Sequence, residues 1–178
     1  MDKYRGIQVD IAVIIEIKEG PQSFVTKLDI TGILQADQDY LRKMLHSTKG
    51  QPYSEYNVAT DRDSVLDYYY NNGYPNAKFD FTSIPAEPNR VDLQFKIDPG
   101  RRQYVRKVLV NGLERTNPDI VTKQISLSSG DPLSQSRITE SQKRLYDLGI
   151  FAKVNTALQN PEGDETSKYV LYSLEEAR

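Results

Sequence analysis

The sequence has no cysteine and no tryptophan, and His46 is its only histidine. The absence of cysteine excludes disulfides and thiolate metal centres, and one imidazole cannot build a multi-histidine metal site. A Cys-His catalytic pair is likewise excluded, and a Ser-His pair would have to use His46. Because the polar residues 47–49 follow His46, we interpret it instead as a cation at the C-terminal end of a helix.

Charge of one sign is not in excess, and long hydrophobic runs are missing. The chain has 23 Lys and Arg residues against 25 Asp and Glu residues, a formal net charge of -2, which argues against nucleic acid as a partner. The longest apolar run near the N-terminus, residues 11–15, stops at Glu16, whereas a membrane-spanning helix needs roughly 20 residues. This run also lacks the basic lead-in and cleavage site of a secretory signal, so we expect a cytosolic chain or a piece of a longer exported protein.

The motifs of the common enzyme classes are also missing. The sequence contains no P-loop, nucleophile elbow, Ser-x-x-Lys, His-Glu-x-x-His or dinucleotide-binding glycine motif. Asp61, Asp63 and Asp67 lie near the start of a predicted helix, where we interpret them as a solvated acidic face and not as a metal or acid-base site. The three tyrosines at 68–70 are interpreted as core and helix packing, because a helix turns about 100° per residue and spreads the rings around it. We therefore expect no enzyme, no metal and no cofactor.

The sequence does contain an internal repeat at an offset of 80 residues, the spacing between Phe24 and Tyr104. Residues 24–32 and 104–112 share a pattern of apolar residues that ends in glycine. Further positions match in the same register: Gly20 with Gly100, Leu41 with Val121, Gly50 with Gly130, Pro52 with Pro132, and Ser54 with Ser134. So many matched apolar and turn positions predict two copies of one structural unit.

Each copy predicts the order strand, helix, helix, strand, strand. The first strands cover residues 24–31 and 104–110, where alternate residues are apolar. The first helices are expected to start at Asp37 and Asn117, both good N-caps, and Pro118 occupies the first helical position in the second copy. This element order belongs to the α+β class.

The second helix of each copy is expected to be the longer one. These helices start near Ser54 and Ser134 and end before Gly73 and Gly149, and the second is four residues shorter. The stripes expected to be buried are Val58, Val65, Leu66 and Tyr69 in the first copy, and Ile138, Leu145 and Tyr146 in the second.

A hairpin follows each of these glycines. Alternating residues predict strands at 77–84 and 91–97 around a turn at 85–89, and the second copy repeats this around a turn at 160–163. Residues 8–18 repeat the pattern of 91–97, so we expect them to be the last strand of a preceding unit, paired with a sheet edge. The predicted domains are therefore residues 1–20, the remainder of a truncated unit, then 21–99 and 100–178.

The segment between the two copies predicts an interdomain hinge at Pro99, Gly100, Arg101 and Arg102. The alternative for its arginines is a basic patch for an anionic partner. We favour a polar linker, because the turn-forming sequence Asp98-Pro99-Gly100 directly precedes the two arginines.

The ordered set of motifs in both copies resembles polypeptide-transport-associated (POTRA) domains, and the resemblance covers nearly the whole chain. Each copy is thereby implied to be a three-stranded mixed sheet covered on one face by two helices. The segments that carry the resemblance are Ile30-Thr31-Gly32, Gly50-Gln51-Pro52-Tyr53-Ser54, the run Tyr69-Tyr70-Asn71-Asn72-Gly73-Tyr74 with Ala77 and Phe79 after it, and Arg144-Leu145-Tyr146-Asp147-Leu148-Gly149-Ile150-Phe151.

In outer-membrane assembly factors of the BamA and TamA type, and in two-partner secretion transporters, such domains lie in the periplasm before a C-terminal outer-membrane barrel. This sequence does not contain a barrel. The Leu-Gly-Ile-Phe motif is similar to the unit nearest the barrel, which implies that residues 100–178 are the barrel-proximal domain. The resemblance implies a location at the periplasmic face of the outer membrane of a Gram-negative envelope. The implied partners are unfolded outer-membrane or secreted polypeptides, and accessory periplasmic proteins or lipoproteins.

The resemblance also places the second strand of each unit at a sheet edge, where an extended client can add by β-augmentation. The implied client edges are Ala77, Lys78, Phe79, Asp80, Phe81 and Thr82 in the first unit and Ala152, Lys153, Val154, Thr156 and Leu158 in the second. Lys78 and Asp80 leave an alternative open, because natural edges use charges against nonspecific pairing. The expected function is client binding and accessory-protein docking in outer-membrane protein assembly. The alternatives are a two-partner secretion transporter, or a spacer or docking module without client binding.

Overall fold

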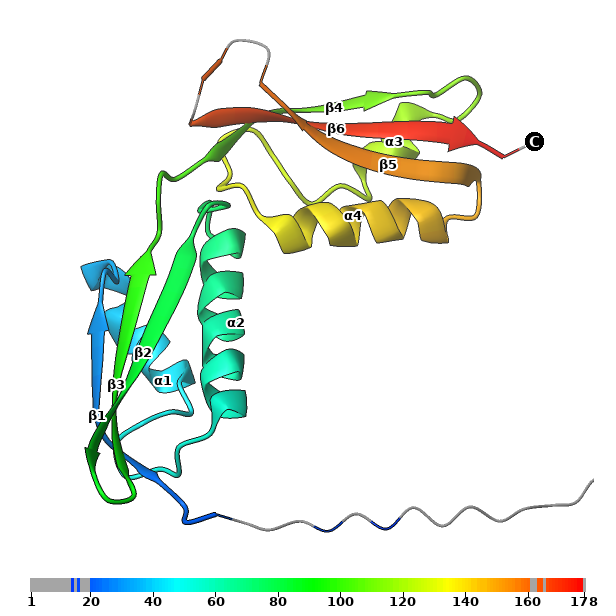
Figure 1. Cartoon of the computed structure of the whole chain (residues 1–178). Coiled ribbons are helices and arrows are strands. Elements are labelled where there is room, and N and C mark those ends of the chain that lie inside the picture. The colour runs from blue at the N-terminus through cyan, green and yellow to red at the C-terminus, as the bar shows by residue number, and fades with distance from the viewer. Residues whose placement is uncertain (1–13, 15, 17–19, 161–162, 165, 178) are drawn as a thin grey trace, which may run out of the picture.

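The chain folds into two three-stranded sheets, each with its own helices (Figure 1). The structure is a computed structural model that describes residues 14, 16, 20–160, 163–164 and 166–177. The strand order is β1-β3-β2 in the first sheet and β4-β6-β5 in the second, with one parallel and one antiparallel pair in each. The predicted α+β class with two repeated units is confirmed. The strand predicted at 8–18 lies outside the described residues except for Ile14 and Glu16, and it stays a prediction.

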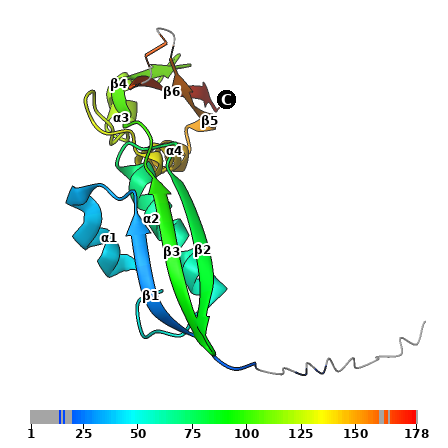
Figure 2. The ribbon, with the colours of Figure 1, turned by 60° about the vertical axis from the view of Figure 1, so that its left-hand side comes forward.

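The first unit has its helices on one face of its sheet, so that the other face is open to view (Figure 2). Its elements are β1 (Phe24–Thr31), the short 3-10 helix η1 (Gln35–Asp37), α1 (Gln38–Met44), α2 (Glu55–Asn71), β2 (Lys78–Glu87) and β3 (Arg90–Asp98). The core between the sheet and the helices contains Val25, Leu41, Val58, Val65, Tyr69, Leu93, Phe95 and Ile97. Of the predicted stripe, Val58, Val65 and Tyr69 are buried, and Leu66 is partly buried against this core.

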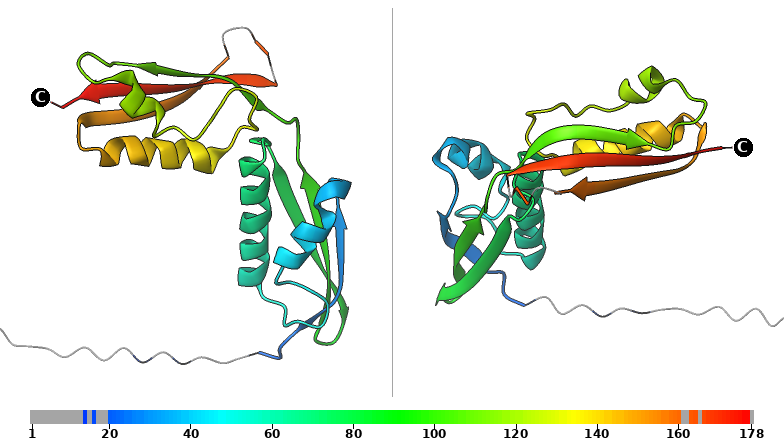
Figure 3. Two further views of the ribbon diagram at one scale, coloured as in Figure 1. Left: turned by 180° about the vertical axis from the view of Figure 1, so that it is seen from behind. Right: turned by 90° about the horizontal axis from the view of Figure 1, so that it is seen from above.

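The second unit repeats the arrangement with a core of its own (Figure 3). Its elements are β4 (Tyr104–Asn111), α3 (Pro118–Thr122), α4 (Gln135–Asp147), β5 (Phe151–Gln159) and β6 (Ser167–Glu176). Helix α4 has 13 residues and α2 has 17, which confirms the predicted difference of one turn. The burial predicted for Tyr146 is wrong, because its neighbour Leu145 takes the core-facing position and leaves Tyr146 exposed.

Strand β2 differs from the sequence-based prediction at both ends. It begins at Lys78, one residue later than expected, and it runs on to Glu87. Pro85 still pairs with Val91, and the pairing of β2 with β3 shifts register between Pro85 and Glu87. The predicted turn at 85–89 is therefore too long, because proline is tolerated in an edge strand at a bulge.

All four predicted cap residues directly precede their helices, and three of them make a side-chain cap hydrogen bond. Ser54 and Ser134 accept hydrogen bonds through Oγ from the first turns of α2 and α4, and Asn117 caps α3 ahead of a proline. Asp37 also directly precedes its helix, α1, as predicted, but it makes no side-chain cap hydrogen bond, because η1 already holds this residue in a helical conformation. Its carboxylate accepts a hydrogen bond from the Tyr68 hydroxyl at 2.8 Å. Burial and this bond raise the pKa of Tyr68 to about 12.

The glycine that ends each first strand is required by a close approach of the central strand. Gly32 and Gly112 both have positive φ, and a Cβ there would lie 1.7 Å and 1.8 Å from the carbonyl oxygens of Ile97 and Leu174. No side chain fits at either position. The repeated glycine is therefore part of how β1 packs on β3 and β4 on β6.

Candidate functional site: the open sheet edge and the contact between units

Strands β2 and β5 are outer strands of their sheets, the position expected for them. Five of the six residues expected at the first edge lie in β2, whereas Ala77 precedes the strand and is buried in the core. All five residues expected at the second edge, Ala152, Lys153, Val154, Thr156 and Leu158, lie in β5. Within β2 only Phe79 is half-buried, and every other residue is exposed.

The direction of the main-chain groups in β2 follows from two contacts on the far side of β3. Thr31 Oγ1 of β1 donates to the carbonyl oxygen of Phe95 at 3.4 Å, and the carbonyl oxygen of Ile97 faces the glycine that ends β1. Because the N–H and C=O of one strand residue point to the same side, Phe95 and Ile97 direct both groups toward β1. Their cross-strand partners, Phe81 and Phe79, therefore direct theirs away from β3.

Strand β2 thus presents main-chain N–H and C=O groups along its free side at Phe79, Phe81 and Ser83. Phe79 packs against Phe95 with ring centroids 4.9 Å apart, so its side chain belongs to the core. Phe81 is 45% exposed and Ile84 is 42% exposed. The free side of β2 therefore combines backbone hydrogen-bonding groups with two accessible apolar side chains.

Strand β5 is partly covered by the helix of its own unit. Gln142 Nε2 of α4 donates to the carbonyl oxygen of Val154 at 2.7 Å. By the same alternation Val154 directs its main-chain groups to the free side, because the carbonyl oxygen of Leu174, its partner, faces the end of β4. The position of Gln142 is taken in the first unit by Arg62, whose guanidinium pairs with Asp63 at 2.8 Å. The β2 edge is therefore the more open of the two.

The acidic group in α2 is not the solvated face that the sequence predicts. Asp61 is fully buried and accepts hydrogen bonds from the backbone nitrogens of His46 and Ser47 at 2.7 and 2.8 Å. His46 Nδ1 lies 3.0 Å from the same carboxylate, so the ring of His46, which follows the end of α1, contacts Asp61. Asp61 is buried because the loop after α1 brings two backbone N–H groups into the core, and these groups need an acceptor. Asp63 and Asp67 are exposed, as expected.

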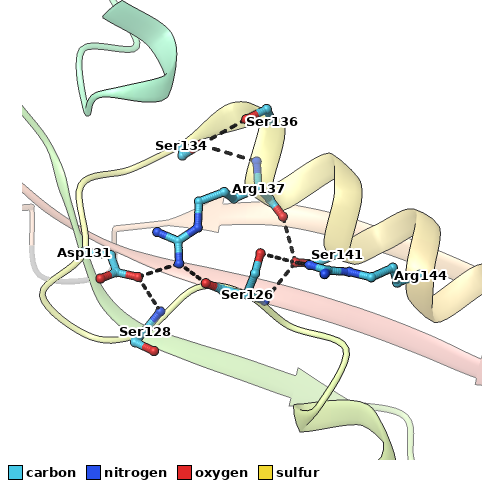
Figure 4. Close-up of polar contacts among 8 residues, drawn as sticks. All are labelled: Ser126, Ser128, Asp131, Ser134, Ser136, Arg137, Ser141 and Arg144. Atoms are coloured by element: carbon cyan, nitrogen blue, oxygen red, sulfur yellow. Dashed lines mark hydrogen bonds and ion pairs between the residues drawn. The ribbon is translucent and has the colours of Figure 1, made fainter. Parts of the chain in front are cut away.

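The second unit holds the equivalent loop with a different set of side chains (Figure 4). Ser141 replaces the aspartate, and its buried Oγ accepts from the backbone nitrogen of Ser126 at 3.1 Å. Arg137 donates to the carbonyl oxygen of Ser126 and pairs with Asp131 at 2.9 Å. Asp131 in turn accepts from the backbone nitrogen of Ser128. These contacts tie the loop to α4, which identifies the cluster as structural.

The linker residues contact both units. Arg102 Nε donates to the carbonyl oxygen of Asn72 at 3.0 Å, and its guanidinium lies over the rings of Tyr74 and Tyr104 at 5.6 and 5.4 Å from their centroids. The backbone nitrogen of Gln103 donates to the carbonyl oxygen of Gly73 at 2.6 Å. Of the predicted hinge, Pro99 is half-buried, Gly100 has positive φ, and Arg101 and Arg102 are exposed. The end of the linker is therefore tied to the C-terminal end of α2.

A second contact joins α2 directly to α4. Asn71 Oδ1 accepts from the backbone nitrogen of Ser136 at 2.9 Å and from Ser134 Oγ at 3.1 Å. Beside this contact, Tyr70, Pro75, Leu133 and Gln135 line a pocket of about 200 Å³. A residue of the first unit thus supplies an acceptor to the first turn of a helix in the second.

Sequence reasoning did not single out Asn71 or Gln142. The partner of Asn71 is 65 residues away, and nothing local marks an asparagine at a helix end as a cap for another helix. Gln142 is signalled only by comparison with Arg62, the residue at the same place in the repeat. Neither a group of metal-ligating side chains nor a helix able to cross a membrane is found among the residues that the structure describes.

The fold and its edges define a tandem array of small sheet-and-helix modules. Residues 24–100 and 103–177 match the POTRA family, described as a surface antigen variable number repeat. The chain therefore belongs to the POTRA family and contains two of its domains.

The similar proteins are outer-membrane assembly factors. The chain is 28% identical over 153 residues to the outer membrane protein assembly factor BamA of Nitratidesulfovibrio vulgaris, covering 83% of this chain and 19% of that protein. It is 25% identical over 142 residues to BamA of Neisseria meningitidis serogroup B, covering 79% and 18%. The crystal structure of Haemophilus ducreyi BamA lacking POTRA domains 1–3 has the same fold, with a TM-score of 0.75, 23% identity, and coverage of 86% of this chain and 29% of that one. The chain thus spans about a fifth of the length of these BamA relatives, and the expected likeness to BamA-type POTRA domains is confirmed.

Proposed function

We propose that this chain is the periplasmic POTRA region of an outer-membrane protein assembly factor, and that it binds unfolded clients in extended form along β2. The observation that carries the proposal is the free side of β2, where Phe79, Phe81 and Ser83 direct main-chain groups away from the sheet. The names of the similar proteins support the assembly context. The same similarity supports the outer-membrane, periplasmic location and the role of accessory proteins as partners.

The mechanism is binding without catalysis. An extended client adds to β2 as a fourth strand, and its backbone N–H and C=O groups pair with those of β2. Because every polypeptide carries these groups, the binding tolerates changes of client sequence. Phe81 and Ile84, three residues apart in β2, supply apolar contacts on opposite faces of the added strand. Lys78 and Asp80 at the start of β2 limit indiscriminate pairing.

The test is amide NMR of the labelled chain titrated with extended peptides from outer-membrane protein strands and with scrambled versions of them. We expect both peptide sets to shift the β2 amides. Ser83→Pro removes one outward N–H from an exposed position and should weaken binding at least about fivefold, the scale of one hydrogen bond. Ser83→Ala keeps that N–H and is the matched control, because it should bind as the parent chain does.

Two results would contradict client binding. One is the absence of any shift at millimolar peptide. The other is binding that Ser83→Pro leaves unchanged while the β2 amides still show a folded sheet, because this would place the peptide elsewhere.

A spacer or docking function is the second candidate, and the contacts of Arg102 with both units favour it. A module that sets the distance and angle between other parts of an assembly needs a fixed joint, and these contacts supply one. Binding to a single folded accessory protein, with none to extended peptides, would favour this function over client binding.

A further inference from the structure

Strand β1 is the other outer strand of the first sheet, and its free side faces away from β3. Phe95 directs its main-chain groups toward β1, and its partner there is Ile30. In a parallel pair such a residue bonds to the two neighbours of its partner, so the N–H and C=O of Ile30 point to the free side. Leu28, two residues earlier, follows the same alternation. Among the described residues, none outside the β1–β3 ladder forms a hydrogen bond with these groups.

A groove of about 320 Å³ runs along this side of β1. Figure 2 shows α1 beside β1, on the side away from β3. The groove is lined by residues 26–30 of β1, by Arg42 and Leu45, and by Thr48 and Lys49 of the loop that follows α1. It therefore lies directly against the strand whose outward main-chain groups have no partner.

The groove carries an excess of positive charge. Lys27 is paired with Asp29 at 2.6 Å within β1. Arg42 and Lys49 are exposed, and neither forms an ion pair with any residue that the structure describes. Lys49 also lines a pocket at the start of β1, and Arg42 lines one toward its end. The two cations thus stand toward opposite ends of the groove.

The second unit does not repeat this charge. Thr122 and Ser129 stand 80 residues after Arg42 and Lys49. Ser129 Oγ donates to the carbonyl oxygen of Arg106 in β4 at 2.6 Å, so it serves the strand of its own unit. The basic groove is therefore a feature of the first unit and not of the repeat.

We propose that this groove binds an extended acidic segment of a partner protein, which adds to the free side of β1. The backbone of the segment pairs with the N–H and C=O groups of Leu28 and Ile30. The stretch between the two cations corresponds to residues 26–30, about 13 Å of extended chain. Two acidic side chains four residues apart, on one face of the segment, therefore meet Lys49 and Arg42. This site is on the opposite edge of the sheet from β2, and the proposal does not rest on client binding there.

The test is amide NMR and hydrogen exchange of the labelled 178-residue chain with a blocked peptide of sequence Glu-Thr-Val-Thr-Glu. Its matched control is the peptide Lys-Thr-Val-Thr-Lys. We expect the acidic peptide to shift the amides of residues 26–30. At saturation it should slow exchange of the Leu28 and Ile30 amides about tenfold or more, because these two amides gain an acceptor. The lysine peptide should do neither.

Variants of the two cations test the charge selection. Arg42→Gln combined with Lys49→Gln should weaken binding of the acidic peptide about fivefold or more, the scale of two exposed ion pairs. The first unit should stay folded, because both side chains are exposed. Lys43→Gln is the matched control, since Lys43 follows Arg42 in α1 but does not line the groove. This variant should bind the peptide as the parent chain does.

Four results would overturn the proposal. The first is the absence of any shift at residues 26–30 at millimolar acidic peptide. The second is equal binding of the lysine peptide, or binding that the double variant leaves unchanged, because charge would then not select the segment. The third is a shift of β2 amides alone, which would place the peptide at the other edge and support client binding there. The fourth is broadening of the groove amides by vesicles of anionic phospholipid but not by the peptide, which would assign the groove to a membrane surface.

Discussion

The side-chain oxygen of Asn71 in α2 lies 2.9 Å from the backbone nitrogen of Ser136 in α4, so one POTRA domain caps a helix of the next. The first turn of a helix has N–H groups without partners in the helix, and it attracts acceptors. Here the acceptor comes from another domain, in addition to Ser134 of the helix itself. The orientation of the two domains is thus coupled to the stability of α4.

Replacing Asn71 should therefore weaken the second domain and the contact together. We expect Asn71→Ala to lower the free energy of unfolding of the second domain by about 0.5–2 kcal/mol, the usual cost of a lost cap. Denaturant titration followed by domain-resolved NMR measures it, and residual dipolar couplings report the orientation. Asn71→Asp keeps an acceptor and should retain most of the stability. An unchanged orientation and stability in Asn71→Ala would mean that the linker contacts of Arg102 and Gln103 fix the joint.

Asp61 provides a second prediction, because it is buried and satisfies two backbone donors. Asp61→Ala leaves both N–H groups without an acceptor in the core, and should destabilise the first domain by about 2–4 kcal/mol. The measurement is the denaturation midpoint of first-domain amides, compared with those of the second domain in the same sample. Asp63→Ala, two residues away and exposed, should change stability by no more than about 0.5 kcal/mol. Equal effects of the two substitutions would contradict the role assigned to Asp61.

Local signals in the sequence predicted the parts of this fold that local physics decides. Ser54, Ser134 and the Asn117-Pro118 pair mark helix starts by their own hydrogen-bonding and ring geometry, and Gly32 marks the end of β1. Asp61 was misread, because an acidic residue in a helix is solvated unless a distant loop turns its donors inward. The loop at residues 46–47 does this, and no pattern within α2 signals it.

The position of the candidate site was predicted, but its openness was not. The resemblance places β2 at an edge, but the openness of that edge depends on whether a helix side chain reaches it. Gln142 reaches Val154 in the second domain, whereas Arg62 at the matched position pairs with Asp63. This difference depends on where a helix side chain lies relative to the edge strand, and the residue pattern of the strand alone does not predict it.

This difference leads to a third prediction, which rests on the proposed client binding. Gln142→Ala frees the carbonyl of Val154, so peptides that shift β2 amides should then shift the amides of β5 as well. We expect a small stability loss of about 1 kcal/mol for the missing hydrogen bond. Lys143→Ala changes an exposed residue of the same helix, and peptides should not shift the β5 amides of this variant. If β5 already responds in the parent chain, Gln142 does not cover the edge.

Glu176 gives a prediction on pH dependence. Its carboxylate accepts hydrogen bonds from the backbone nitrogens of Glu114, Arg115 and Thr116, and these bonds lower its pKa from 4.5 to about 2. A carboxyl group with a lowered folded-state pKa stabilises the fold while it is ionised. That contribution is fully present above pH 4.5 and is lost as the pH falls toward 2. The amide shift of Thr116 should therefore titrate with a midpoint near 2.

The neighbouring Glu175 supplies the control for this titration. Its carboxylate pairs with Lys153 on the exposed surface at 2.9 Å and does not bond the loop at 114–116. Glu176→Gln should remove the Thr116 titration and speed hydrogen exchange at residues 114–116, because the charge that strengthens these bonds is lost. Glu175→Gln should change neither. A Thr116 midpoint near 4.5 in the parent chain would show that the three bonds do not hold the ionised carboxylate in solution.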